Sequence, residues 1–143
     1  MPILTKNVSN HTTAIHRILH TMLRVSDLKR SEYFYMQLLG MKLLRRKDYP
    51  KGEFTLSFLG YGNESSHTVL ELTHNWGNNQ YDMGSAFGHI AIAVSNIYQT
   101  CNKLKQGGAK ISRPPGPMKD DESELIAFIQ DPDGYQIELI ERK

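Results

Sequence analysis

The chain has 143 residues, 39% of them hydrophobic and 22% charged, which suits one ordinary folded domain with a sizeable core. Lys and Arg exceed Asp and Glu by only 17 − 15 = 2, which does not indicate a nucleic-acid or membrane partner. The single cysteine, Cys101, excludes an internal disulfide and is predicted to be a partly buried helix residue. No signal peptide or membrane-spanning run is recognisable, so the cytoplasm is the expected compartment.

Residues 1–17 are polar and irregular and are predicted to form a flexible N-terminal extension of a single domain, 18–143. Hydrophobic periodicity then predicts a first module, about 18–83, with elements in this order: strand 18–25, helix 27–39, and strands 41–46, 53–60 and 67–73. A loop rich in Asn and Gly, 75–86, leads to a second module, about 86–143. Its predicted elements are strand 88–94, helix 96–106 and strands 110–112, 125–130 and 135–141.

Two turns are predicted in the second module. Pro114, Pro115 and Pro117 predict a turn directly after strand 110–112, because proline removes a backbone donor from a strand. The segment Asp131-Pro132-Asp133-Gly134 predicts a turn before the last strand, because proline presets φ and glycine accepts positive φ.

The two modules repeat one order of elements, βαβββ, and their sequences agree in three separated blocks. His20-x4-Val25-Ser26-Asp27-Leu28 matches His89-x4-Val94-Ser95-Asn96-Ile97 at a shift of 89 − 20 = 69 residues. Phe58-Leu59 matches Phe128-Ile129 at a shift of 70, and Leu70-Glu71-Leu72 matches Ile137-Glu138-Leu139 at a shift of 67. The period exceeds that of solenoid repeats, so the predicted fold is α+β, built by duplication of one module.

Each module carries one His near its first strand and one Glu on its last. Each Glu is flanked by aliphatic residues inside a strand, which is costly unless a charged partner meets it. Two imidazoles and two carboxylates suit a first-row divalent ion, so the sequence predicts one metal site from His20, Glu71, His89 and Glu138. Strand alternation places Arg24 on the face of His20, and Asn75 on the face of Glu71. The other four histidines, His11, His16, His67 and His74, are predicted not to be ligands.

These residues lie in segments that resemble the glyoxalase I (lactoylglutathione lyase) family of the vicinal-oxygen-chelate superfamily. The segments are LHTMLRVSDLKRSEYFY, LLGMKLLR, FTLSFLGYG, VLELTHNWG, FGHIAIAV and AFIQDPDGYQIELIE. The resemblance implies the glyoxalase/bleomycin-resistance fold and a homodimer with each site between the first module of one subunit and the second module of the other. His at position 20 resembles the bacterial type, which implies nickel, with cobalt next and zinc as the alternative.

The resemblance also implies a reaction, the isomerisation of the methylglyoxal–glutathione hemithioacetal to S-D-lactoylglutathione through a metal-bound enediolate. Glu138 would be the leading base and Glu71 its counterpart. Substrate contacts would come from Arg24, Asn75, His89 and Lys119, with Arg24 and Asn75 at the γ-glutamyl end of the thiol and Lys119 over the glycyl end.

The chain departs from the family after Lys119, where Asp120, Asp121 and Glu122 replace small residues. These carboxylates would repel the glycyl end of the thiol if they faced inward. Two other functions remain open from the sequence alone: another metal-dependent superfamily member such as an acyl-CoA epimerase, and a metal-free drug-binding protein. A metal-dependent thiol transferase acting on an antibiotic is disfavoured, because such relatives have three protein ligands and Glu71 would be a fourth.

Overall fold

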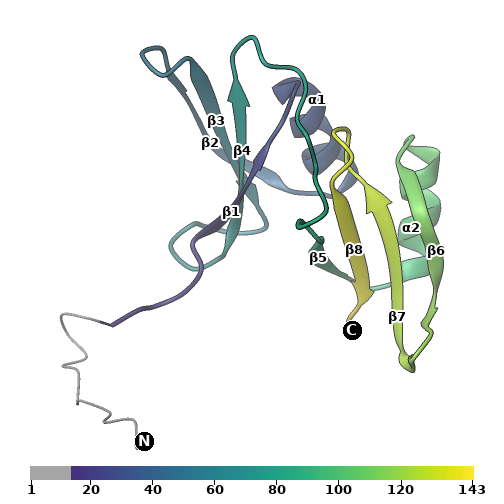
Figure 1. The fold of residues 1–143 in the computed structure, drawn as a ribbon. Helices are drawn as coiled ribbons and strands as arrows, with labels where there is room; N and C mark the ends of the chain where they lie inside the picture. The colour runs from purple at the N-terminus through teal and green to yellow at the C-terminus, as the bar shows by residue number, and fades with distance from the viewer. Residues whose placement is uncertain (1–13) are drawn as a thin grey trace, which may run out of the picture.

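The computed structural model describes residues 14–143, so most of the predicted N-terminal extension lies outside the described residues. The chain forms two four-stranded mixed sheets, each accompanied by helix (Figure 1). The predicted α+β fold with two βαβββ modules is confirmed. The first module consists of β1 (His20–Arg24), α1 (Leu28–Tyr33), the π-helix η1 (Phe34–Leu38), β2 (Lys42–Tyr49), β3 (Phe54–Gly60) and β4 (Val69–Asn75).

The second module repeats this order with one helix. It consists of β5 (Ile90–Val94), α2 (Ile97–Gln106), β6 (Lys110–Met118), β7 (Asp121–Gln130) and β8 (Gln136–Glu141). The strand orders are β1-β4-β3-β2 and β5-β8-β7-β6, so β1 and β5 each lie at an edge of their sheet. In both sheets the edge strand pairs in parallel with the last strand of its module, and the remaining pairs are antiparallel.

The register of the two sheets repeats residue by residue around the two glutamates. Glu71 lies opposite Phe58 on β3, and Glu138 lies opposite Phe128 on β7. Each outer strand also carries a bulge at the same place, between Leu43 and Arg45 in β2 and between Ile111 and Arg113 in β6. A bulge re-aims the side chains beside it, so the duplication preserved local geometry as well as topology.

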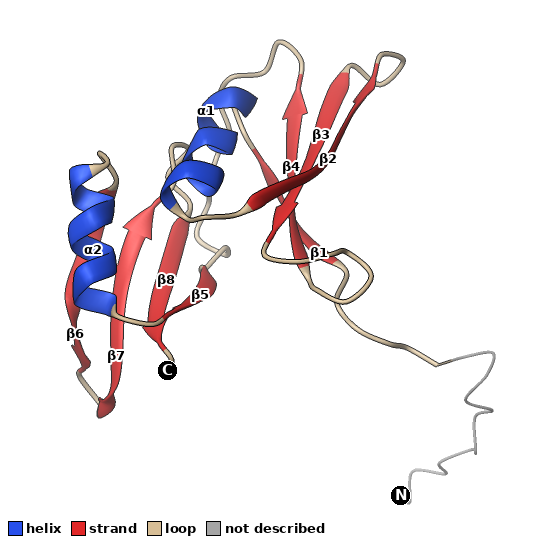
Figure 2. Cartoon of the chain, turned by 180° about the vertical axis from the view of Figure 1, so that it is seen from behind, coloured by secondary structure: helices blue, strands red, loops and turns tan. Residues whose placement is uncertain are grey.

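The two α-helices begin with the same kind of side-chain cap and cover the same side of the molecule. The side chains of Asp27 and Asn96 each accept a hydrogen bond from the backbone N–H three residues later. Seen from behind in Figure 2, both helices lie in front of the strands, which leaves the opposite sheet faces free of helix. The helix predicted at 27–39 continues from α1 into η1.

In residues 14–143 no helix is long and apolar enough to span a membrane.

The turn predicted at the three prolines is wrong, because β6 continues through them to Met118. Two features permit this. β6 is an edge strand, where a missing backbone donor costs least. The Arg113 guanidinium also donates hydrogen bonds of 2.8–3.0 Å to the carbonyls of Pro114, Gly116, Pro117 and Ile126. β7 correspondingly begins at Asp121, four residues earlier than predicted, and β2 extends to Tyr49.

The interiors of the two modules differ in chemistry. In the first module Glu32 is buried and accepts a hydrogen bond of 2.8 Å from the Ser57 hydroxyl. It also receives two N–H groups of the Arg46 guanidinium, at 2.8 and 3.1 Å. Burying a carboxylate without such partners is costly. The repeat shift of 101 − 32 = 69 places Cys101 of α2 at the corresponding position of the second module.

Cys101 is expected to be chemically unreactive in the folded chain. Its side chain is buried, more completely than the sequence predicted, and burial raises the pKa of the thiol, so little thiolate forms near neutral pH. Alkylation by iodoacetamide, followed by mass spectrometry, should be slower than in the guanidinium-unfolded chain by on the order of 100-fold. Equal rates in the two states would contradict this placement of the thiol.

Candidate metal centre

The first module brings His20 and Glu71 together on its helix-free face. His20 is the first residue of β1 and Glu71 lies in the middle of β4, the strand beside it. His20 Nε2 lies 3.2 Å from Glu71 Oε2, with the two side chains 40% and 12% exposed. The Phe58 ring packs edge-on against the imidazole, with ring centroids 5.6 Å apart and planes at 82°. These three residues are called the first half-site below.

The second module repeats this arrangement. His89 Nε2 lies 3.4 Å from Glu138 Oε1, with the side chains 43% and 16% exposed. The Phe128 ring meets the His89 ring edge-on at 5.3 Å and 81°. These three residues are the second half-site. His89 immediately precedes β5, so the strand begins two residues later than predicted. The repetition of distance and ring angle supports one shared role for the two pairs.

One chain does not unite the two half-sites. Among residues 14–143, no three side chains of the His, Cys, Asp and Glu types lie close enough to hold one ion together. Each half-site offers one imidazole nitrogen and one carboxylate oxygen, both accessible to solvent. These donors fit a borderline divalent cation such as nickel, cobalt or zinc, and two half-sites together would supply two negative charges to balance it.

The surroundings of the two half-sites differ. The Arg45 guanidinium stacks over the Phe58 ring, 3.7 Å from its centroid, and donates hydrogen bonds of 2.8 and 3.1 Å to Glu64. These hydrogen bonds hold the pKa of Glu64 below its ordinary value. In the second module Arg113 takes the position of Arg45 opposite the phenylalanine, but its guanidinium binds backbone carbonyls instead. The sequence showed the phenylalanines as part of the repeat but not as partners of the histidines.

Arg24 and Asn75 meet on the same face as the first half-site. Arg24 Nη1 donates a hydrogen bond of 2.9 Å to Asn75 Oδ1, and the Tyr81 hydroxyl approaches the same oxygen at 3.4 Å. The backbone carbonyl of Arg24 accepts a hydrogen bond of 2.8 Å from the Tyr135 hydroxyl in the second module. Sequence reasoning did not identify Tyr135, because this contact joins residues 111 positions apart.

Lys119 lies far from this pair within one chain. It occupies the exposed turn between β6 and β7, beside Asp120, and Asp121 begins β7. In both ribbon views this turn lies at the opposite end of the molecule from the ends of β1 and β4 (Figures 1 and 2). A shared ligand for Lys119 and Arg24 therefore requires a second subunit.

The remaining described histidines lie apart from the two half-sites. His67 Nδ1 is 2.8 Å from the Ser66 hydroxyl, and His74 Nδ1 is 3.2 Å from the carbonyl of Val25. His16 is exposed before β1, and His11 lies outside the described residues.

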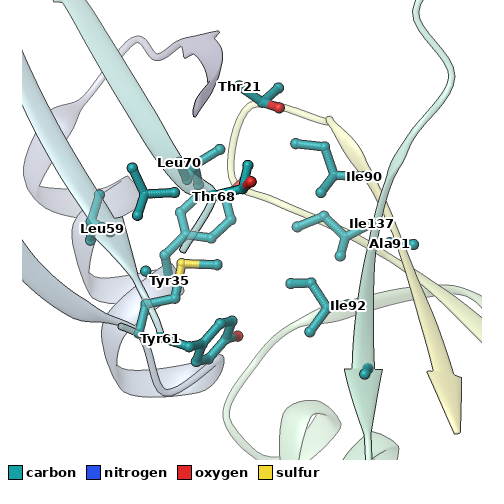
Figure 3. A pocket seen from close by; sticks show the side chains of 14 residues that line it. Thr21, Tyr35, Leu59, Tyr61, Thr68, Leu70, Ile90, Ala91, Ile92 and Ile137 are labelled. Carbon is teal, nitrogen blue, oxygen red and sulfur yellow. The ribbon is translucent and has the colours of Figure 1, made fainter. Parts of the chain in front are cut away.

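A cavity of about 390 Å³ lies between the two modules (Figure 3). Thr21, Leu59 and Leu70 border it on one side, and Ile90 and Ile92 on the other. Thr21 and Leu70 follow and precede the half-site residues His20 and Glu71, so strand alternation directs them to the opposite sheet face. Within residues 14–143 the cavity has no charged lining side chain, and it is separate from both half-sites.

Comparison with known proteins agrees with this geometry. The Glyoxalase/Bleomycin resistance protein/Dioxygenase superfamily profile matches residues 17–139. A probable lactoylglutathione lyase of Synechocystis is 60% identical over 124 residues, covering 87% of this chain and 94% of that protein. The lactoylglutathione lyase of Neisseria meningitidis is 57% identical over 127 residues, covering 89% and 91%.

Solved structures agree as well. Glyoxalase I of Zea mays superposes with a TM-score of 0.85 at 48% identity. The match covers 88% of this chain but only 44% of the maize chain, so this chain spans less than half the maize protein. The trypanothione-dependent glyoxalase I of Leishmania major superposes with a TM-score of 0.81 at 47% identity, covering 89% and 87%. The chain belongs to the glyoxalase I (lactoylglutathione lyase) family of the Glyoxalase/Bleomycin resistance protein/Dioxygenase superfamily.

Proposed function

We propose that the chain is a lactoylglutathione lyase that isomerises the hemithioacetal of methylglyoxal and glutathione to S-D-lactoylglutathione. The observation that carries this proposal is the repeated His–Glu pair, 3.2 Å in one module and 3.4 Å in the other, on a face that also holds Arg24 and Asn75. Relatives named lactoylglutathione lyase, 52–60% identical over most of their length, support the same reaction.

We infer that the working enzyme is a homodimer in which the first half-site of one subunit meets the second half-site of the other. One observation in favour is that the two half-sites are separate in a single chain. A second is that β1 and β5, which begin at or beside the two histidines, are both edge strands. Exposed Ile18, Leu19 and Met22 lie in and before β1. An apolar edge strand of this kind is a liability unless another surface covers it.

In this arrangement His20 and Glu71 of one subunit, with His89 and Glu138 of the other, would hold one divalent ion per site. When bound, such an ion acts as a Lewis acid that polarises the oxygens of the substrate and acidifies the proton on C1. Nickel is the expected ion because His20 resembles the bacterial type, with cobalt next and zinc as the alternative. Donor chemistry alone ranks these ions weakly, because all three accept imidazole and carboxylate.

The residues of the chain then perform the proton transfers. Glu138 removes the proton from C1, the released electron pair forms the carbon–carbon double bond, and the π pair of the C2 carbonyl moves onto its oxygen to give an enediolate. The same carboxyl group returns the proton to C2, and the C1 hydroxyl proton passes to the C2 oxygen, which leaves a thioester carbonyl at C1 and a hydroxyl at C2. Glu71, its pseudo-symmetric counterpart, is the alternative base. Arg24, held by Asn75, pairs with the carboxylate of the γ-glutamyl end.

Lys119 would reach the glycyl carboxylate from the partner subunit, because its turn is remote from Arg24 in the same chain. Asp120 on this turn, and Asp121 and Glu122 at the start of β7, are exposed. Their exposure supports carboxylates that point into solvent, away from an anionic ligand, which is compatible with glutathione as the thiol.

Metal removal tests the proposal directly. Dialysis against a chelator should lower thioester formation from methylglyoxal and glutathione by on the order of 100-fold or more. Nickel, cobalt and zinc, added back separately, should restore the rate in that order. Calcium is the control, because it prefers sites built from oxygen ligands alone. An absence of turnover with every ion would rule out this reaction and leave an acyl-CoA epimerase or a metal-free binding protein as the alternatives.

A further inference from the structure

The turn between β7 and β8 connects the second module to the first through side-chain hydrogen bonds. Asp133 Oδ1 accepts hydrogen bonds from the backbone N–H of Ser26 at 3.0 Å and from its hydroxyl at 2.6 Å. Asp133 Oδ2 accepts a longer one, of 3.3 Å, from the Ser31 hydroxyl. The buried Tyr35 hydroxyl donates to Asp131 Oδ2 at 2.6 Å. Ser26 and Ser31 lie between the end of β1 and η1, and Tyr35 lies within η1, so the turn holds the segment that follows β1.

The same turn places Tyr135 with little freedom. Asp131 Oδ1 accepts hydrogen bonds of 2.9 Å from the backbone N–H groups of both Asp133 and Tyr135. The Tyr135 ring packs edge-on against Phe87, with centroids 5.4 Å apart and planes at 78°. Phe87 precedes the ligand His89 by two residues. The Tyr135 side chain therefore leaves a fixed backbone beside the second half-site and points toward the first module.

The Tyr135 hydroxyl ends on the backbone carbonyl of Arg24, at 2.8 Å. Burial, and then the nearby carboxylates of Asp131 and Asp133, raise the pKa of Tyr135, so the hydroxyl keeps the proton that it donates. Arg24 is the last residue of the edge strand β1, and the backbone N–H groups of the next two residues are also hydrogen-bonded, to Thr73 and Asp133. Tyr135 of the second module binds the Arg24 carbonyl, whereas the Arg24 guanidinium binds Asn75 of the first module.

We propose that Tyr135 is a positioning residue for thiol binding, which holds the backbone of Arg24 so that the guanidinium stays at Asn75. In this way a residue of the second module sets how tightly Arg24 of the first module binds the γ-glutamyl end of the thiol. The proposal rests on the proposed function for the role of Arg24, but the Tyr135–Arg24 contact itself does not.

The substitution Tyr135→Phe removes the hydroxyl and keeps the ring against Phe87. Because Arg24 contacts the thiol rather than the reacting carbons, KM for the hemithioacetal should rise about five-fold while kcat stays within about two-fold. Ser31→Ala is the matched control, because it removes a hydroxyl from the same inter-module contact without touching Arg24. It should lower the melting temperature similarly and leave KM unchanged. If Tyr135→Phe and Ser31→Ala have equal KM values, the role of Tyr135 is structural only, which would overturn the proposal.

A second measurement does not depend on turnover. NMR relaxation of the Arg24 Nε–H group in the zinc-loaded protein should show a lower order parameter in Tyr135→Phe than in the wild type or in Ser31→Ala. An unchanged order parameter would overturn the inference whatever the kinetic assay gives. If the wild type shows no turnover but the order parameter of Arg24 still falls in Tyr135→Phe, the proposed function alone would be overturned.

Discussion

Glu138→Gln is expected to lower kcat by about 1,000-fold, the middle of the range for loss of general acid–base catalysis, while the metal content stays at the wild-type level. The amide has the size of the carboxyl group, and its oxygen is still a ligand. It cannot take a proton from carbon at neutral pH. The decisive measurements are kcat for thioester formation, metal content by elemental analysis, and the thermal unfolding curve.

Glu71→Gln provides the matched control, because Glu71 has a corresponding histidine and phenylalanine beside it. Each carboxylate lies 3.2–3.4 Å from a histidine and opposite a phenylalanine on the next strand. If Glu138 is the base, Glu71→Gln should retain a rate at least about ten-fold higher than Glu138→Gln. A fully metallated Glu138→Gln enzyme with the wild-type rate would contradict the assignment of the base. The reverse order of rates would transfer the role to Glu71.

Mixing two inactive variants should regenerate activity if each site is shared between subunits. One variant carries His20→Ala and Glu71→Gln, and the other carries His89→Ala and Glu138→Gln. In a mixed dimer, one site combines the two altered half-sites and the other combines the two intact ones. Random exchange makes half of the dimers mixed, so about one quarter of the wild-type activity should return. The background is the activity of each variant alone: one variant lacks the His20 and Glu71 ligand groups, and the other lacks the His89 ligand and the proposed base Glu138.

The exchange is best achieved by unfolding and refolding the two variants together in the presence of nickel. Refolding each variant alone and then mixing the folded proteins is the control for slow subunit exchange. An intrachain site predicts no recovery under any mixing protocol, because every chain then carries one defective half of its own site. Failure to recover activity, with mixed dimers demonstrated by native mass spectrometry, would contradict the shared site.

The closeness of one histidine to one glutamate in each module could be anticipated from the sequence, because it depends on strand order within a module. His20 and Glu71 lie on neighbouring strands, and alternation along a strand determines the face that each one takes. Whether the two half-sites combine into one metal site is a different kind of question. It depends on how two surfaces associate, and the pattern within one chain is the same for a shared site as for an intrachain site.

The features that the sequence did not reveal depend on side chains that reach across the fold. The Arg113 guanidinium stabilises β6 through its prolines by binding four carbonyls, which no turn rule anticipates. Tyr135 reaches Arg24 in the other module. The shift from α1 into η1 at Phe34 likewise has no signal in hydrophobic periodicity, because a π-helix and an α-helix of this length bury similar faces.

The contrast between Glu32 and Cys101 bears on the history of the chain. After the ancestral gene doubled, the helix-facing interiors diverged. An ion pair occupies one of them, and a thiol takes the place of Glu32 in the other. The open faces still carry the same histidine, phenylalanine and glutamate in the same register. Many side-chain combinations fill a core of given volume, whereas few can coordinate an ion. The interiors were therefore free to differ between the two modules, whereas the open faces kept the side chains that the proposed metal site needs.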